Sequence, residues 1–157
     1  MKSALIIVAI LACGFTSASG QGKLLSNDPL TGLPLHPGTN PGNGLGNRPT
    51  QMPEGPICNS KQQSEFYSIY KMKTDDVVSW YASRLAGFKK FSGYASERAQ
   101  IAFRNSDGTT LVIVTGDKGA KGANVEAYSV AYERYQPGLP EKTVAGLTLG
   151  NLDCRSK

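Results

Sequence analysis

The chain has 157 residues, a formal net charge of +5 and a single histidine. Nucleic-acid-binding proteins concentrate lysine and arginine in a stripe interleaved with aromatic residues. This chain has no run of five like charges, so we expect no nucleic-acid partner. One histidine and three cysteines leave few ligands for a metal site, so we expect neither a metal ion nor a cofactor.

The first twenty residues are typical of a secretion signal. Lys2 supplies the positive charge, an unbroken apolar stretch covers residues 4–12, and small residues follow. The apolar stretch is too short for a membrane-spanning helix, which takes ~20 residues. We therefore predict a signal peptide over residues 1–20 and an exported mature chain from Gln21, secreted or periplasmic and not membrane-spanning.

Two cysteines remain once the signal is removed. Cys58 and Cys154 lie near the two ends of the predicted domain, and neither has a CxxC partner or a nearby histidine. In an oxidising compartment such a pair predicts one disulfide. Cys13 lies within the signal and has an alternative interpretation as a lipidated cysteine. The large Leu11 and the short apolar stretch before Cys13 count against that lipid anchor.

The segment that follows the signal has an unusual composition. Residues 21–56 contain seven prolines and seven glycines and no aromatic residue. Proline removes hydrogen-bond donors and glycine raises the entropy of the unfolded chain, so the segment predicts a disordered linker. An alternative is a docking peptide at residues 30–37, which contain His36, the only histidine. We do not expect a lone histidine in a disordered stretch to act as a ligand or a base.

An α+β domain is predicted for residues 57–157, where aromatic and β-branched residues begin. Partial alternation predicts a strand over residues 64–71. A hydroxyl and two carboxylates at residues 74–76 offer a helix start, and apolar residues then recur at three- and four-residue spacing. This pattern predicts a helix over Asp75–Ala86. We expect Trp80, on the apolar stripe of that helix, to be a core anchor.

Further strands follow the helix. The alternating or β-branched segments cover residues 88–94, 96–104, 109–115 and 125–135. Asp107 and Gly108 predict a tight hairpin turn between the second and the third of them. Strands joined by short loops pair antiparallel. We therefore expect the order β-α-β-β-β-β, with a single helix on a four- to five-stranded antiparallel sheet and an irregular tail.

The tyrosines suggest a binding surface. The last predicted strand places Tyr128 and Tyr132 on one side and small residues on the other, and we expect the small side to face the helix. Tyr67, Tyr128 and Tyr132, with Tyr135 as a further candidate, would then cluster on the uncovered face and bind a sugar polymer, a peptide or a partner subunit. The alternative is that these are ordinary tyrosines of a sheet face.

The loop Gly116–Asn124 is a second candidate site. Its three glycines expose backbone N–H groups, and Lys118 and Lys121 add positive charge, so the loop could bind an anion. It lacks the spacing of a phosphate-binding loop and a following helix. The alternative is a long hairpin turn exposed to solvent.

One resemblance concerns shape. The run from Tyr70 through Asp75, Trp80 and Gly87 to the strand at Ile101 is similar to a single βαβββ module of glyoxalase-like (vicinal oxygen chelate) proteins. Those enzymes place histidine and glutamate ligands on the strands of two modules. This chain has one such module and no histidine in it, so the resemblance implies the shape without the metal chemistry.

Catalytic side chains are scarce in the predicted domain. It has no histidine, and its adjacent acids Asp75 and Asp76 are explained as helix caps. The sequence therefore favours a non-enzymatic binding or accessory module, secreted or periplasmic, that acts on a protein or a surface polymer through its aromatic sheet face. The alternatives are a small-ligand or anion-binding domain that uses the Gly116–Asn124 loop, and an enzyme whose site forms on oligomerisation.

Overall fold

A computed structural model describes residues 25–40, 57–95, 98–117 and 126–151. Its elements follow one another as β1 (Thr39–Asn40), β2 (Lys61–Ile69), α1 (Thr74–Ala82), β3 (Lys89–Ala95), β4 (Arg98–Arg104), β5 (Thr110–Asp117), β6 (Ala127–Gln136) and α2 (Glu141–Thr148). The α+β class is therefore confirmed, whereas the single helix is wrong because the described residues already form two.

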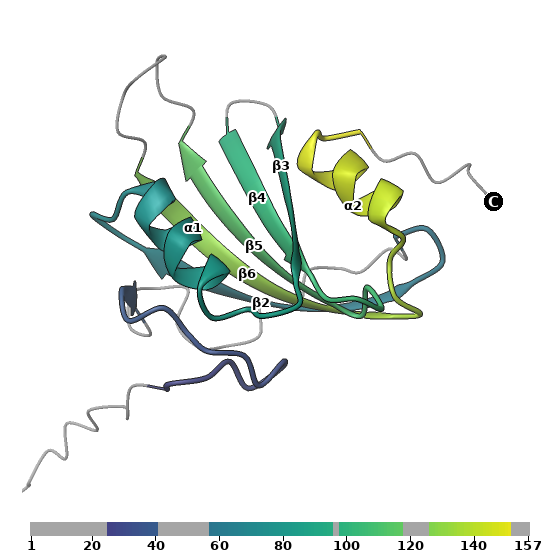
Figure 1. The fold of residues 1–157 in the computed structure, drawn as a ribbon, viewed down its shortest axis with the longest axis horizontal. Coiled ribbons are helices and arrows are strands. Elements are labelled where there is room, and N and C mark those ends of the chain that lie inside the picture. Colours follow the sequence, from purple (N-terminus) through teal and green to yellow (C-terminus); the bar gives the residue numbers. More distant parts are fainter. Residues whose placement is uncertain (1–24, 41–56, 96–97, 118–125, 152–157) are drawn as a thin grey trace, which may run out of the picture.

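The strands form one antiparallel sheet in the order β1-β2-β6-β5-β4-β3 (Figure 1). The five strands β2 to β6 match the predicted antiparallel sheet, and β1 adds a sixth strand that was not predicted. The predicted turn joins β4 to β5. Gly108 has φ 75°, and its N–H donates to the carbonyl of Asn105 at 3.1 Å. The carboxylate of Asp107 accepts from the N–H and the hydroxyl of Thr109, at 2.9 and 2.7 Å. These residues supply the positive φ and the side-chain acceptor that a short hairpin requires.

Helix α1 covers one face of the sheet. Successive strand residues point to opposite faces, so one set of side chains from β2, β5 and β6 packs in the layer beneath this helix. The buried side chains of this layer include Tyr67, Ile69, Val77, Tyr81, Val112, Val114, Val130 and Tyr132. Helix α1 is shorter than the predicted helix Asp75–Ala86, because it ends at Ala82 and a turn leads from there to Gly87, where φ is 82°. Trp80 is only partly buried, at the edge of this layer.

The opposite face carries the second helix, which lies beside β3 in Figure 1. Leu139 and Val144 are buried there with Ala102, Leu111 and Tyr135. An added Cβ at Gly93 would lie 2.4 Å from the carbonyl oxygen of Thr148, so glycine is needed where α2 crosses β3. The expected irregular tail is wrong over residues 141–148, where eight residues form α2.

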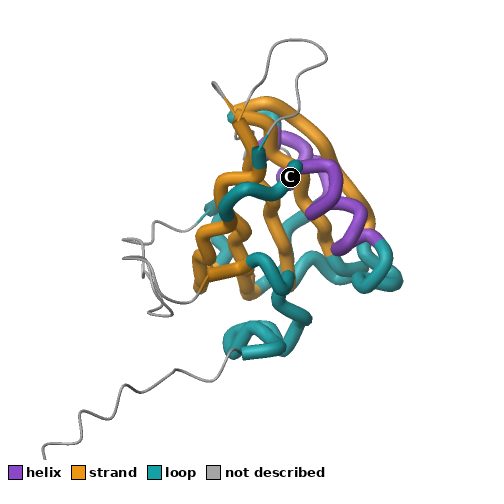
Figure 2. The backbone as a smooth tube through the Cα atoms, turned by 90° about the vertical axis from the view of Figure 1, so that its left-hand side faces the viewer, coloured by secondary structure: helices purple, strands orange, loops and turns teal. Residues whose placement is uncertain are grey.

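The largest departure from expectation is in the predicted linker. Residues 25–40, called the arm below, pack on the domain, and Figure 2 shows that they are almost entirely loop. Asp28, Leu35 and His36 are buried, and Thr39 pairs with Ile69 through β1. The disordered linker is therefore wrong for residues 25–40.

Several other predictions fall on residues that the structure does not describe. Residues 41–56 lie outside the described part of the chain, as does the predicted signal peptide with Cys13. Cys58 occupies a turn with φ 51° and is disulfide-bonded. Because Cys154 also lies outside the described residues, its pairing with Cys58 stays a prediction. None of the helices that the structure describes is long and apolar enough to cross a membrane.

Candidate functional site

The arm begins with a tight turn built by its own sequence. The N–H of Gly32, where φ is 72°, donates to the carbonyl of Asp28 at 2.8 Å. The Oδ2 atom of Asp28 accepts from the N–H and the hydroxyl of Thr31, at 2.7 and 2.6 Å. An aspartate whose side chain binds the following backbone, then a proline, then a glycine with positive φ are typical turn residues. The turn fixes the fully buried Asp28 carboxylate against β2.

Two carboxyl groups meet at one phenol beneath this turn. The hydroxyl of Tyr67 lies 2.8 Å from Oδ1 of Asp28 and 2.8 Å from Oε2 of Glu65. Burial, followed by the hydrogen bond with Asp28, raises the pKa of Glu65 to about 7, although the hydrogen bond with Tyr67 acts in the opposite direction. Burial and the two carboxyl groups also raise the pKa of Tyr67. Asp28 of the arm and Glu65 and Tyr67 of β2 therefore form one hydrogen-bonded cluster, in which the pKa of Glu65 is raised.

A row of hydroxyl groups holds the next part of the arm. The N–H of His36 donates to the hydroxyl of Tyr81 at 3.2 Å, and the hydroxyls of Tyr81 and Tyr132 are 2.6 Å apart. Tyr132 in turn donates to the carbonyl of Pro34 at 2.7 Å. Burial raises the pKa of Tyr81 to about 12 and raises that of Tyr132 as well. Both phenols therefore keep their protons and serve as structural donors.

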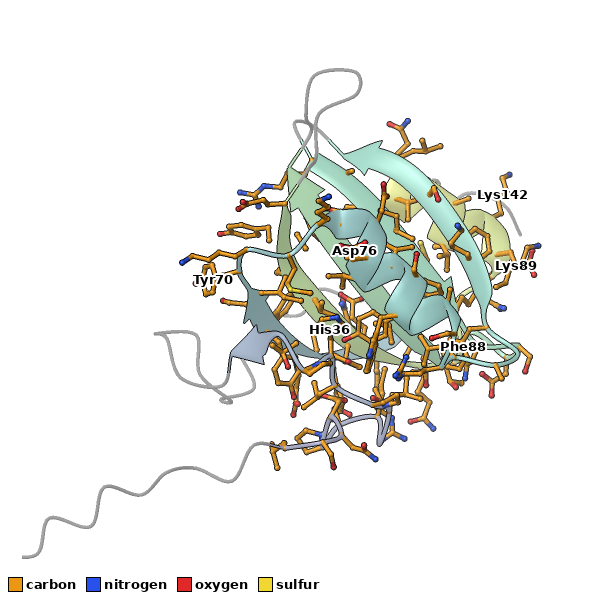
Figure 3. All side chains as sticks on the ribbon, turned by 60° about the vertical axis from the view of Figure 1, so that its left-hand side comes forward. His36, Tyr70, Asp76, Phe88, Lys89 and Lys142 are labelled. Carbon is orange, nitrogen blue, oxygen red and sulfur yellow. The ribbon has the colours of Figure 1, made fainter. Side chains whose placement is uncertain are left out.

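The imidazole of His36 is enclosed between the arm and α1 (Figure 3). Its Nδ1 atom accepts from the N–H of Gly38 at 2.9 Å, and the ring meets that of Trp80 edge-on with centroids 4.9 Å apart. Burial, and next the positive charge of Arg84, lower the pKa of His36. The histidine is therefore held neutral as a packing residue, and a partly buried tryptophan covers it.

The predicted aromatic face is wrong in its composition. Tyr67 and Tyr132 are 4% and 0% exposed and lie beneath α1 and the arm, with ring centroids 5.5 Å apart. Helix α1 packs on the tyrosine side of β6, whereas the small side that was expected to face it carries Ser129 and Ala131 on the other surface. Period-two alternation separates two faces, but it cannot say which of them a helix covers.

Tyr135 belongs to the layer on the α2 side. Its hydroxyl donates to the Oε2 atom of Glu133, and both side chains are buried. Burial raises the pKa of Glu133, against the opposing effects of its hydrogen bonds with Tyr135 and Gln62. Burial, followed by the Glu133 carboxyl, raises the pKa of Tyr135. This pair is a second buried carboxyl–phenol contact, and it is separate from the arm.

Tyr128 is turned out of the sheet. Strand register passes from the pair Thr115–Ser129 to the pair Gly116–Ala127, so Tyr128 is an extra residue in a β-bulge. Its side chain is 46% exposed, and the guanidinium carbon of Arg98 lies 4.4 Å from its ring centroid. The bulge thus presents an aromatic ring with a cation on one face.

Tyr70 stands at the same end of the sheet and is also exposed (Figure 3). It follows β2 by one residue, and Ser68 of β2 pairs with Ser129 of β6. Tyr70, Tyr128, Arg98 and the exposed Lys71 and Lys73 are called the loop end below. Of the predicted site residues, Tyr128 is the one that the structure places on an open surface among those it describes.

The glycine loop is only partly described. An added Cβ at Gly116 would lie 2.2 Å from the hydroxyl oxygen of Thr74, so this glycine permits the close contact between β5 and the start of α1. Its role is therefore packing. Lys118 and Lys121 lie outside the described residues, and their anion site stays a prediction.

The other acidic residues that the structure describes do not gather into a site. Asp75 and Asp76 are exposed in the first turn of α1, while Glu126 is exposed and Glu133 is buried. Within the described ranges, no group of three histidine, cysteine, aspartate or glutamate side chains is arranged to hold a metal ion.

Comparison with protein families, with characterised proteins and with solved structures found no match. The similarity to one glyoxalase-like module is also incomplete, because four strands follow α1 here and β2 pairs with the last of them. Function must therefore be argued from this chain alone. Asp28 and Glu65 were not among the predicted site residues, although the Asp-Pro-x-Thr-Gly sequence at residues 28–32 is a turn signal that could have pointed to Asp28.

Proposed function

We propose that the protein is an exported, non-enzymatic binding module that holds an acidic surface polysaccharide at the loop end. The observation that carries this proposal is the β-bulge that turns Tyr128 outward and holds Arg98 over its ring. Bulges recur where a strand must re-aim one side chain, often beside functional sites. A residue with only a packing role would follow the alternation of β6 and point beneath α1.

Exposed aromatic surface concentrates at this end. Four large hydrophobic side chains are exposed in the part of the chain that the structure describes, namely Leu25, Tyr70, Tyr128 and Leu149. Two of these are the tyrosines of the loop end. A tyrosine offers an apolar ring face and a hydroxyl that stays in water, which suits stacking against the ring of a hydroxylated polymer.

The charge of the surroundings favours an acidic polymer. Arg98, Lys71 and Lys73 are exposed at the loop end. Lys118 and Lys121 belong to the segment that joins β5 to β6, and the whole chain carries a net charge of +5. A guanidinium stacked on a ring keeps N–H groups available for a carboxylate.

The test is retention of the full mature chain on immobilised polygalacturonate, with neutral dextran as the comparison matrix. We expect Tyr128→Ala to weaken retention about tenfold, which corresponds to about 1.4 kcal/mol. Lys118→Ala/Lys121→Ala should weaken it mainly at low salt. Leu149→Ala, an exposed hydrophobic residue at the end of α2, is the matched control and should bind as the wild type does. Equal retention of all the variants would overturn the proposal.

We also infer that the disulfide partner of Cys58 is Cys154, which would join the start of the domain to its end. Cys13 lies in the predicted signal, so the mature chain would hold only these two cysteines. Protease digestion without reduction, followed by mass spectrometry, should give one linked peptide pair that contains both residues. Alkylation of Cys154 in unreduced, freshly purified protein would contradict this pairing.

A further inference from the structure

The arm contacts the domain at two ionisable sites, and the hydrogen bonds at these two sites favour opposite protonation states. We propose that docking of the arm takes up one proton at the Asp28–Glu65 pair and expels one from His36, so that the arm holds with nearly constant strength from acidic to neutral pH. This inference concerns the arm and is independent of what the loop end binds.

The geometry of the carboxyl pair requires that one of its two groups be protonated. The hydroxyl of Tyr67 has one proton, and it lies 2.8 Å from an oxygen of each carboxyl group. It donates to one group, so the other must donate a proton of its own or stand as an uncompensated charge. The Oδ2 atom of Asp28 already accepts two hydrogen bonds from Thr31, so the oxygens of Asp28 serve as acceptors in this cluster. Glu65 is therefore the group that carries the proton.

The hydrogen bond at Nδ1 keeps the imidazole of His36 in its neutral form. Nδ1 of His36 faces the backbone N–H of Gly38 at 2.9 Å. A backbone N–H is always a donor, so Nδ1 must be an acceptor and cannot itself be protonated. His36 is 4% exposed, and the guanidinium of Arg84 opposes any positive charge there. The docked arm therefore holds a neutral ring, whereas a released arm frees the ring to bind a proton.

The charged and titratable neighbours are few. Tyr81 of α1 and Tyr132 of β6 lie near Asp28, and both remain protonated. Arg134 of β6 donates to the carbonyl of Leu30 at 3.3 Å. Arg84, two residues beyond the end of α1, places its positive charge near His36. Apart from Glu65 of β2, these neighbours of the arm are neutral phenols or cations.

The contributions of Glu65 and His36 to docking of the arm depend on pH in opposite directions. Burial and the hydrogen bond with Asp28 raise the pKa of Glu65 from 4.5 to about 7, so the part of this rise that the arm supplies favours docking at low pH and is lost as the pH rises through about 7. The pKa of His36 falls from 6.5, so its contribution is complete above pH 6.5 and is lost as the pH falls below that value. Below pH 6.5 the proton gained at Glu65 and the proton lost from His36 therefore act against each other.

Two matched substitutions separate the effects. Glu65→Gln keeps the shape of a protonated glutamate and cannot titrate, while His36→Asn keeps a side-chain acceptor for the N–H two residues on. The readout is the protection of the Leu35 amide, which donates to Ser26 at 2.9 Å, measured by hydrogen exchange in the full mature chain. The Val112 amide in the central strand β5 reports global unfolding for comparison.

The profiles between pH 4.5 and 6.5 decide the matter. We expect wild-type protection to change only a few-fold. Protection in Glu65→Gln should fall on acidification by up to about tenfold per pH unit, and in His36→Asn it should rise by a similar factor. The double variant should again be flat. Single variants that keep the wild-type profile, or that change in the same direction, would overturn the proposal.

A second measurement needs no substitution. Carboxyl ¹³C and imidazole shifts of the wild-type chain report the two groups directly. Glu65 should titrate near pH 7, and His36 should titrate below 6.5. Midpoints of 4.5 for Glu65 and 6.5 for His36 would show that docking moves no protons, whether or not the variants fold.

Discussion

The tyrosines of the arm contact and those of the loop end play opposite parts. Tyr67, Tyr81 and Tyr132 are buried, and each hydroxyl contacts the arm or a neighbouring phenol. Tyr70 and Tyr128 are about half-exposed and leave their rings in water. The residue type is the same, so composition alone cannot assign the role. What separates the two groups is whether a buried acceptor lies within reach of the hydroxyl.

Tyr132→Ala is the substitution for which we expect the largest loss of stability. The side chain is fully buried and its hydroxyl holds the carbonyl of Pro34, so we expect a loss of about 3–5 kcal/mol in the free energy of unfolding. Urea denaturation followed by circular dichroism would measure it. A loss below about 1 kcal/mol would place Tyr132 among the surface tyrosines.

Tyr67→Phe tests the hydroxyl alone. The ring keeps its edge-on contact with Tyr132, while Asp28 and Glu65 lose the phenol between them. We expect a cost of about 1–3 kcal/mol at neutral pH, seen as faster exchange of the arm amides. Tyr70→Phe is the matched control, because Tyr70 is exposed, and it should leave the arm unchanged. Equal protection in both variants would mean that the shared hydroxyl does not hold the arm.

Glu133→Gln tests the carboxyl–phenol pair that lies away from the arm. Burial raises the pKa of Glu133 above 4.5, so its contribution to stability is complete below pH 4.5 and is lost as the pH rises through the raised pKa. The stability difference between wild type and Glu133→Gln should therefore drift with pH, by at most about 1.4 kcal/mol per pH unit. Unfolding free energies at several pH values would measure it, and a constant difference would contradict the burial of a titrating group.

The smallest expected effect on stability is that of Tyr128→Ala. Its ring contacts Arg98 in solvent, and an exposed cation–π pair contributes about 0.5–1 kcal/mol. We therefore expect less than about 1 kcal/mol of destabilisation together with weakened polymer retention. Denaturation and binding measured on one preparation would separate the two. A large loss of stability would make Tyr128 a packing residue and remove the basis of the loop end.

Local signals predicted the parts of the fold that depend on nearby residues. The Asp107–Gly108 turn and the positions of five strands follow from turn residues and alternation. The approximate start of α1 was also predicted, but its N-cap is Lys73 with no side-chain cap, and Asp75 and Asp76 place negative charge in the first turn instead. The second helix was missed because eight residues after a proline give a weak periodic signal, and its burial depends on Leu139 and Val144 meeting β3 and β4. Only the folded sheet creates that contact.

The arm shows the limit of composition more clearly. Proline and glycine suggested disorder, yet those residues build a turn, and the bonds that fix it reach far along the chain. Tyr67 bonds Asp28 across 39 positions, and Tyr132 bonds Pro34 across 98. Partners so distant leave no periodic trace in one sequence. The same limit concealed which side of β6 the helix would cover.

The bulge at Tyr128 has a consequence for how this surface can change. Ala127 and Val130 both face α1 although three positions separate them, because Tyr128 is the additional residue between them. Deleting Tyr128 would restore plain alternation while every other side chain of β6 kept its side of the sheet. A one-residue gap elsewhere in the strand would turn its core outward. Residue 128 could therefore be substituted or deleted during evolution without a change in the rest of the fold.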